Sequence, residues 1–158
     1  MLFRSNRCVK VHSLDKNIGL ASVMNLGLLE VKEMGYAYAV LFDQDSQVPE
    51  GFFANMLTAF LEAQRLSVRP IAAIGPRIVS LRNDTAMPFK LFSRIFKRSD
   101  VRLVGSQRLF KAEFLISSGC FIAVECLELI GPMKDAYFID NIDLEWCFRA
   151  TEIGRAHV

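Results

Sequence analysis

Two aspartates separated by one residue are the first place in the chain where residue type and spacing suggest chemistry. They are Asp43 and Asp45, and they follow an apolar run over residues 36–42 that predicts a strand buried on both faces. Open α/β sheets bind ligands at the carboxyl ends of their strands. Because two carboxylates this close repel, we expect a divalent cation carrying a phosphate between them. The alternative is a solvated turn into a helix capped by Ser46 or Gln47.

Three other segments have residue types suited to a site. Asn17 and Gly19 precede a predicted helix, where a cap and a close backbone approach are expected. The run Ser117-Ser118-Gly119 permits a bend or a close ligand approach within a predicted strand. Asp143 falls in the first turn of another predicted helix, where the helix dipole favours a carboxylate, so capping alone is a competing role.

Helices and strands that alternate along the chain must position these residues. Helices are predicted from Gly19 to Gly35, from Pro49 to about Leu66, over residues 125–130 and over residues 142–153. Strands are predicted over residues 36–42, 71–74 and 113–124, with a further short one over Cys8 to Val11. This alternation predicts a single α/β domain over residues 1–158 whose mostly parallel sheet is flanked by helices.

Composition excludes several classes of protein. Hydrophobic residues make up 52% and charged residues 23% of the chain, which is typical of a globular domain, and thirteen are Phe. No apolar stretch reaches the length needed to span a bilayer, and Met1 to Lys10 lacks the apolar core of a signal peptide, so we expect a cytoplasmic location. The four cysteines lack Cys-x-x-Cys spacing, which favours buried free thiols over disulfides or a zinc site.

Positive charge is concentrated in one segment. Arg77 to Lys111 holds nine Lys or Arg and two acids, a balance of +7, so the rest of the chain carries −5 of the net +2. Within it, Phe89 to Arg98 interleaves apolar and basic residues, which is typical of a solvated loop whose Phe residues fold back on the core. The alternative is a basic amphipathic helix that contacts an anionic membrane or a lipid phosphate. Nucleic-acid binding is not expected, since no base-reading motif is present.

Four motifs occur in an order that resembles one known family. They are Asn17-x-Gly19-x-Ala21-x-x-x-Asn25-x-Gly27, Leu41-Phe42-Asp43-Gln44-Asp45-Ser46, Ile116-Ser117-Ser118-Gly119, and the run from Phe138 to Arg149. Together they resemble the inverting nucleotide-sugar glycosyltransferases, most closely the rhamnosyltransferase branch of glycosyltransferase family two. The resemblance covers residues 17–154 except the basic segment. It implies a partial nucleotide-diphospho-sugar transferase (GT-A-like) fold.

The resemblance also implies a reaction and roles for individual residues. A deoxysugar, rhamnose from dTDP-rhamnose, moves to a saccharide or lipid-linked acceptor in cell-surface polysaccharide synthesis, at the inner face of the membrane. Asp143 matches the general base. Asp45 matches the ligand of Mg²⁺ or Mn²⁺, with Asp43 supporting the metal or the ribose. The other donor-side residues are Asn17, Gly19, Asn25 and Gln44. The acceptor-side residues are Ser118, Gly119, Glu145 and Trp146, and packing alone is a competing role for Trp146.

The chain departs from the family pattern at both ends. The strands that hold the base and ribose, expected before Asn17, and the usual continuation after the last helix have no counterpart. We therefore expect a truncated domain with exposed sheet edges that favour dimerisation. A non-catalytic binding or remnant module is the alternative function. A phosphatase or phosphotransferase with Asp43 as nucleophile and Asp45 as acid fits less well, since that class usually has Thr or Val at the position of Gln47.

Overall fold

A mixed four-stranded sheet forms the centre of the molecule. The computed structural model describes residues 9–80, 82–92, 98–101 and 109–157. The strand order is β1 (Tyr38–Val40), β7 (Phe121–Ala123), β2 (Ile71–Ile74) and β8 (Ala156–His157). Strand β7 pairs antiparallel with both β1 and β2, whereas β2 pairs parallel with β8.

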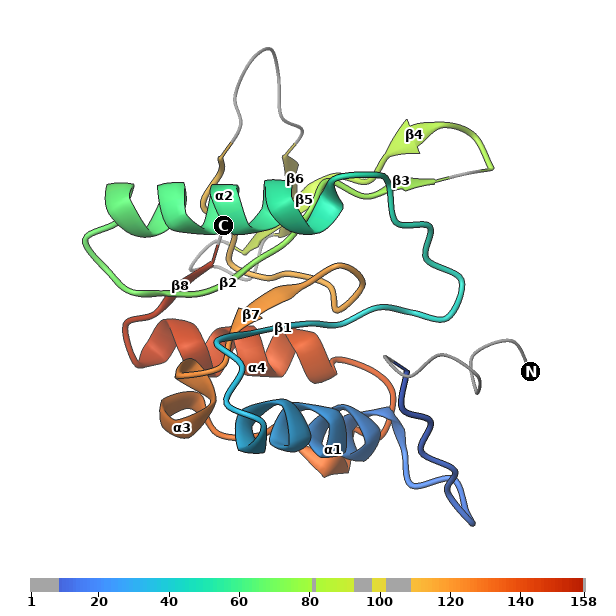
Figure 1. Cartoon of the computed structure of the whole chain (residues 1–158). Helices are drawn as coiled ribbons and strands as arrows, with labels where there is room; N and C mark the ends of the chain where they lie inside the picture. Colours follow the sequence, from blue (N-terminus) through green and yellow to red (C-terminus); the bar gives the residue numbers. More distant parts are fainter. Residues whose placement is uncertain (1–8, 81, 93–97, 102–108, 158) are drawn as a thin grey trace.

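Helices cover both faces of this sheet (Figure 1). Helix α2 (Phe52–Leu66) lies on one face, and α1 (Leu20–Glu33), α3 (Cys126–Ile130) and α4 (Ile142–Glu152) lie on the other. A short 3-10 helix, η2 (Asp135–Tyr137), precedes α4. Helix α2 faces the sheet with residues at helical spacing, the buried Phe52, Met56, Phe60 and Ala63.

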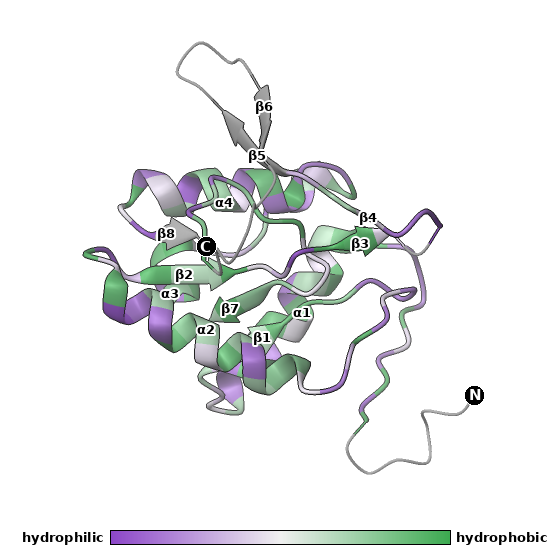
Figure 2. Ribbon diagram, turned by 90° about the horizontal axis from the view of Figure 1, so that it is seen from above, coloured by the Kyte–Doolittle hydropathy of each residue, from purple (hydrophilic) through white to green (hydrophobic). Residues whose placement is uncertain are grey.

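The core lies between these two layers of helices. Every residue of β2 and β7 is buried, as expected for strands covered on both faces, and Figure 2 shows both strands coloured as hydrophobic. The expectation of free, buried thiols is confirmed for the cysteines that the structure describes after residue 8, which are Cys120, Cys126 and Cys147.

The four helices predicted outside the basic segment are present, but two of the predicted strands are shorter than expected. The strand expected over residues 36–42 is limited to β1, and the one expected over residues 113–124 is limited to β7. Not every apolar residue of α2 faces the sheet, because Phe53, Leu57 and Leu61 are exposed. Hydrophobic spacing identified the helices but did not separate their buried from their exposed apolar residues.

The prediction of a mostly parallel sheet is wrong for the strands described. Strands β1 and β2 run parallel to each other and are joined through α2, as expected for a crossover unit, but they are not neighbours. Strand β7 enters between them in the opposite direction. The chain from β2 to β7 makes no helical crossover in its described residues, so the alternation that justified the prediction stops at β2.

The basic segment forms hairpins where it is described. Strands β3 (Val79–Ser80) and β4 (Thr85–Ala86) pair antiparallel, and so do β5 (Phe89–Phe92) and β6 (Arg98–Val101). The alternative of an amphipathic helix from Phe89 to Arg98 is therefore wrong at both its ends, which are strands and not a loop, and residues 93–97 lie outside the described part. The alternation at the start of β5 also suits a strand, which explains the error.

Two further expectations concern the start of the chain and the membrane. Residues 9–11 form no helix or strand, and Cys8, the start of the strand predicted there, lies outside the described residues. Within the described part of the chain, no helix has the length and apolar character to cross a membrane.

Candidate functional site

The loop that follows β1 carries the two aspartates of the Asp-x-Asp motif. The backbone N–H of Leu41 donates to the carbonyl of Cys120 at 3.0 Å, and the N–H of Gly119 donates to the carbonyl of Leu41 at 2.7 Å. These bonds continue the β1–β7 pairing beyond the strands. Asp43, Gln44 and Asp45 then turn away from the sheet and are exposed.

A side-chain hydrogen bond ties this loop to the segment before β7. The hydroxyl oxygens of Ser46 and Ser118 lie 2.5 Å apart. The sequence offered no direct signal for this pair, because 72 residues separate the two serines. The Asp43 loop and the Ser117-Ser118-Gly119 segment, which the sequence analysis treated as separate motifs, therefore lie side by side.

The carboxylate of Asp143 joins α4 to the same place. Its Oδ2 accepts the backbone N–H of Ser117 at 3.1 Å, and its Oδ1 accepts the N–H of Leu144 at 2.8 Å. Burial raises the pKa of this carboxyl above its usual value, against the effect of these hydrogen bonds, and the nearby negative charge of Asp43 raises the pKa further. Asp143 thus binds an N–H in the first turn of α4, as the capping role requires. Its carboxylate is also within electrostatic reach of Asp43.

Three predicted site elements therefore converge at one end of the sheet. They are the Asp-x-Asp loop, the Ser117–Gly119 segment and the first turn of α4. The carboxyl end of β1 and the amino end of β7 both lie at this end of the sheet, because the two strands are antiparallel neighbours. The arrangement brings a partly buried carboxylate, suited to accept a proton, close to a pair of exposed carboxylates suited to bind a cation.

The two exposed carboxylates fit a magnesium or manganese ion that also binds phosphate. Magnesium is commonly held by one or two carboxylates, with phosphate oxygens and waters completing its shell. No cluster of three or more His, Cys, Asp or Glu suited to a metal occurs among the described residues. A metal here would need further donors from a ligand besides the carboxylates of Asp43 and Asp45, and metal binding by these two residues stays a prediction.

Asn17 and Gly19 lie where α1 meets the loop before α4. The side-chain oxygen of Asn17 accepts the N–H of Gly19 at 2.9 Å. The N–H groups of Leu20 and Ala21 donate to the carbonyl of Phe138, at 2.6 and 3.4 Å. A backbone carbonyl thus occupies the start of α1, and no sequence pattern indicated this contact. The donor-side roles of Asn17 and Gly19 stay predictions.

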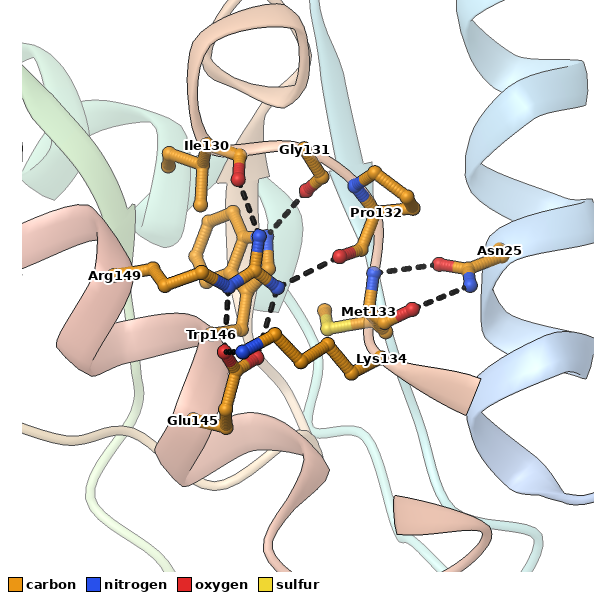
Figure 3. Close-up of polar contacts among 9 residues, drawn as sticks. All are labelled: Asn25, Ile130, Gly131, Pro132, Met133, Lys134, Glu145, Trp146 and Arg149. Carbon is orange, nitrogen blue, oxygen red and sulfur yellow. Dashed lines mark hydrogen bonds and ion pairs between the residues drawn. The ribbon is translucent and has the colours of Figure 1, made fainter. Parts of the chain in front are cut away.

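Asn25 uses its whole side-chain amide inside the protein (Figure 3). Its Nδ2 donates to the carbonyl of Met133, and its Oδ1 accepts the N–H of the same residue, both at 2.8 Å. The Nδ2 also donates to Asp135 at 3.1 Å. These bonds fasten α1 to the segment before η2. They give Asn25 a structural task, and contact with a nucleotide stays a prediction.

Glu145, Trp146 and Arg149 hold the turn after α3 (Figure 3). The Arg149 guanidinium donates to both carboxylate oxygens of Glu145, at 2.7 and 2.8 Å, and to the carbonyls of Ile130 and Pro132. The indole N–H of Trp146 donates to the carbonyl of Gly131 at 3.1 Å. Glu145 also pairs with Lys134, a residue that the sequence analysis did not single out.

Three of the residues predicted on the acceptor side, Trp146, Gly119 and Ser118, have contacts within the protein. Trp146 is 1% exposed, so its side chain packs in the core, and an acceptor contact stays a prediction. Gly119 has a positive φ of 77°, and a Cβ there would lie 2.6 Å from Pro76. A close approach of backbone to a neighbour thus explains this glycine without a ligand. Ser118 is the acceptor-side residue whose hydroxyl bonds the Asp-x-Asp loop.

Comparison with known proteins supports the resemblance carried by the motifs. No family model matches the chain. The chain is similar to the dTDP-rhamnosyl transferase RfbF of Shigella flexneri, with 29% identity over 147 residues. The match covers 92% of this chain and 48% of that protein, so the chain spans about half the length of the curated relative it matches. The similarity favours a rhamnosyltransferase-like glycosyltransferase.

Proposed function

We propose that the chain belongs to an inverting glycosyltransferase that moves a deoxysugar, rhamnose from dTDP-rhamnose, to a saccharide or lipid-linked acceptor. One observation carries the proposal: the carboxylate of Asp143, held by the N–H of Ser117, lies within electrostatic reach of Asp43. The similarity to a dTDP-rhamnosyl transferase supports the choice of donor. We place the reaction in polysaccharide synthesis on the cytoplasmic side of the membrane.

Asp143 acts as the general base in this proposal. The acceptor hydroxyl gives its proton to a carboxylate oxygen of Asp143 while the hydroxyl oxygen attacks the anomeric carbon in line, which inverts the configuration. The raised pKa suits this task, because a carboxylate of higher pKa holds the proton better. The N–H of Ser117 fixes the orientation of the carboxylate, and Ser118 lies next to it on the acceptor side.

Asp45 and Asp43 act on the donor side. They would hold Mg²⁺ or Mn²⁺, whose charge neutralises the diphosphate as it leaves. Gln44 lies between them on the same exposed loop, where it can contact the nucleotide. The hydrogen bond between the hydroxyls of Ser46 and Ser118 keeps this loop beside the acceptor segment, so the donor diphosphate and the acceptor hydroxyl meet in one place.

The donor side is tested by calorimetric titration with thymidine diphosphate, with and without Mn²⁺. We expect binding that requires Mn²⁺ and weakens by about tenfold or more in Asp45→Asn, because a metal ligand is lost. Asp84→Asn is a matched control: Asp84 is exposed on the β3–β4 turn at a φ of 50°, which Asn tolerates well. Absence of metal-dependent binding in the folded protein would refute the donor site.

The base is tested by release of thymidine diphosphate from dTDP-rhamnose in the presence of acceptors. We expect Asp143→Asn to slow transfer by about 10²–10⁴-fold and to leave thymidine diphosphate binding nearly unchanged. Normal turnover by this variant would contradict the assignment of Asp143 as the base.

A further inference from the structure

A small apolar cavity lies beside the site and has no role in the chemistry described so far. Its volume is about 60 Å³. The walls are formed by Gly75, Pro76 and Ile78 after β2, by Met87 and Pro88 after β4, and by residues 114–116 before β7. All of these side chains are apolar. The N–H of Met87 donates to the carbonyl of Ile78 at 2.9 Å, which holds two of the walls together.

Two of these walls are continuous with the proposed acceptor side. Ile116 lines the cavity, and the next residue, Ser117, donates its N–H to the carboxylate of Asp143. Pro76 also lines the cavity and packs against Gly119, where a Cβ would lie 2.6 Å from its ring. The lining residue Ile116 is therefore the immediate neighbour in the chain of Ser117, whose N–H binds the carboxylate of Asp143.

The size and chemistry of the cavity restrict what it can hold. One water needs roughly 10–15 Å³ of such space, so the cavity takes only a few non-hydrogen atoms, fewer than a hexose ring has. Its lining offers no polar side chain, so a hydroxyl inside would lose hydrogen bonds to water without gaining a side-chain partner. A single aliphatic substituent fits both limits.

We infer that this cavity receives the C6 methyl group of a 6-deoxyhexose acceptor. The inference rests on the proposed function, because it assumes that the acceptor hydroxyl lies at Asp143. The cavity then selects an acceptor with a methyl group over one with a hydroxymethyl group at the same carbon. The two groups differ by one hydroxyl, and an apolar pocket discriminates against an added hydroxyl by about tenfold to a hundredfold.

The test compares two acceptors that differ only at C6, methyl α-L-rhamnopyranoside and methyl α-L-mannopyranoside. Both are titrated into the full chain, with and without thymidine diphosphate and Mn²⁺, while methyl resonances are followed by NMR. We expect the rhamnoside to bind about tenfold more tightly and to shift the methyl resonances of Ile78 and Leu115.

Variants of one wall and its neighbour give the control. Ile78→Phe fills the cavity and is expected to abolish the preference, whereas Val79→Phe, on an exposed neighbour outside the lining, is expected to retain it. Ile78→Ala, which enlarges the cavity without overpacking, is expected to reduce the preference. It keeps the test valid if Ile78→Phe does not fold.

The outcomes separate this inference from the proposed function. If thymidine diphosphate binds with Mn²⁺ but the two glycosides bind equally, the cavity inference is overturned and the proposed function stands. If thymidine diphosphate does not bind, the donor site fails, and the glycoside titrations without nucleotide still decide the cavity. Shifts of Ile78 and Leu115 with octyl glucoside but not with the rhamnoside would also overturn it, since a lipid chain would be the ligand.

Discussion

Replacing Gly19 by Ala tests whether the start of α1 and the loop before α4 form one rigid joint. Gly19 has φ 85° and ψ 154°, a backbone conformation that is nearly restricted to glycine. A Cβ at this position would lie 2.6 Å from Cδ2 of Phe138 and 3.0 Å from its carbonyl oxygen. That same oxygen accepts the N–H of Leu20, so it cannot retreat without breaking the bond.

The cost of this substitution has two parts. A side chain held in so rarely populated a conformation costs about 1–3 kcal/mol. Overpacking against the ring of Phe138 adds about 1–3 kcal/mol, although the ring is at an exposed position and can yield in part. We therefore expect Gly19→Ala to lower the free energy of unfolding by about 3 kcal/mol, equivalent to a melting temperature lower by about 6–12 °C. Urea unfolding followed by circular dichroism measures it.

Gly27 provides a matched control within the same helix. A Cβ there would meet nothing within 4 Å. Gly27→Ala is therefore expected to stabilise the protein by about 0.5–1 kcal/mol, because Ala favours a helix over Gly. Adding Phe138→Ala to Gly19→Ala removes the ring contact and is expected to recover the steric part only. If the Gly19→Ala variant is as stable as the Gly27→Ala variant, the joint does not exist as described.

Two further predictions concern α4. Arg149→Lys loses the paired bonds to Glu145 and the bonds to two carbonyls, so we expect the free energy of unfolding in urea to fall by about 1–3 kcal/mol. Arg65→Lys, at an exposed position, is the control and is expected to leave this free energy unchanged. For Asp143, the folded-state pKa exceeds the unfolded value of about 3.9, so the folded protein binds more protons and loses stability as pH rises between the two. Asp143→Asn should therefore gain stability relative to the native protein across that window, and a pH-independent difference would contradict the raised pKa.

Local signals in the sequence determined most of the helices and one strand. Strand β2 is the apolar run Ile71–Ile74, bounded at its end by Gly75 and Pro76, and its limits match the prediction. Helix α3 ends before Gly131, as the Gly-Pro pair predicts. In each case the residues that start or stop the element are neighbours in the chain, so no knowledge of the fold is needed.

The pairing of β7 between β1 and β2 could not be predicted in this way. It depends on contacts between residues more than 40 apart, such as Ala73 with Ile122, and no single segment carries that information. A buried strand has the same apolar run in either direction. The closeness of Ser46 to Ser118 follows from this pairing, so the spatial arrangement of the site was beyond sequence patterns, although its residues were not.

The same limit explains why several predicted ligand contacts have internal partners. Asn25 and Trp146 were assigned from motifs, yet their polar atoms bond backbone carbonyls of Met133 and Gly131. A carbonyl has no signature in the sequence, because every residue has one. Residue type could therefore identify a hydrogen-bonding side chain but not distinguish a substrate partner from a backbone partner.

These internal bonds all fix the segment between α3 and α4. Helix α1 holds the segment before α4 at two points, through the carbonyl of Phe138 and through Asn25, while α4 holds the turn after α3 through Trp146 and Arg149. The chain between α3 and α4 is thus fixed from both helices, and Asp143 follows it directly. Asp43 and Asp45 stay exposed, whereas other residues of the same motifs fix the position of Asp143, which is the base in the proposed function.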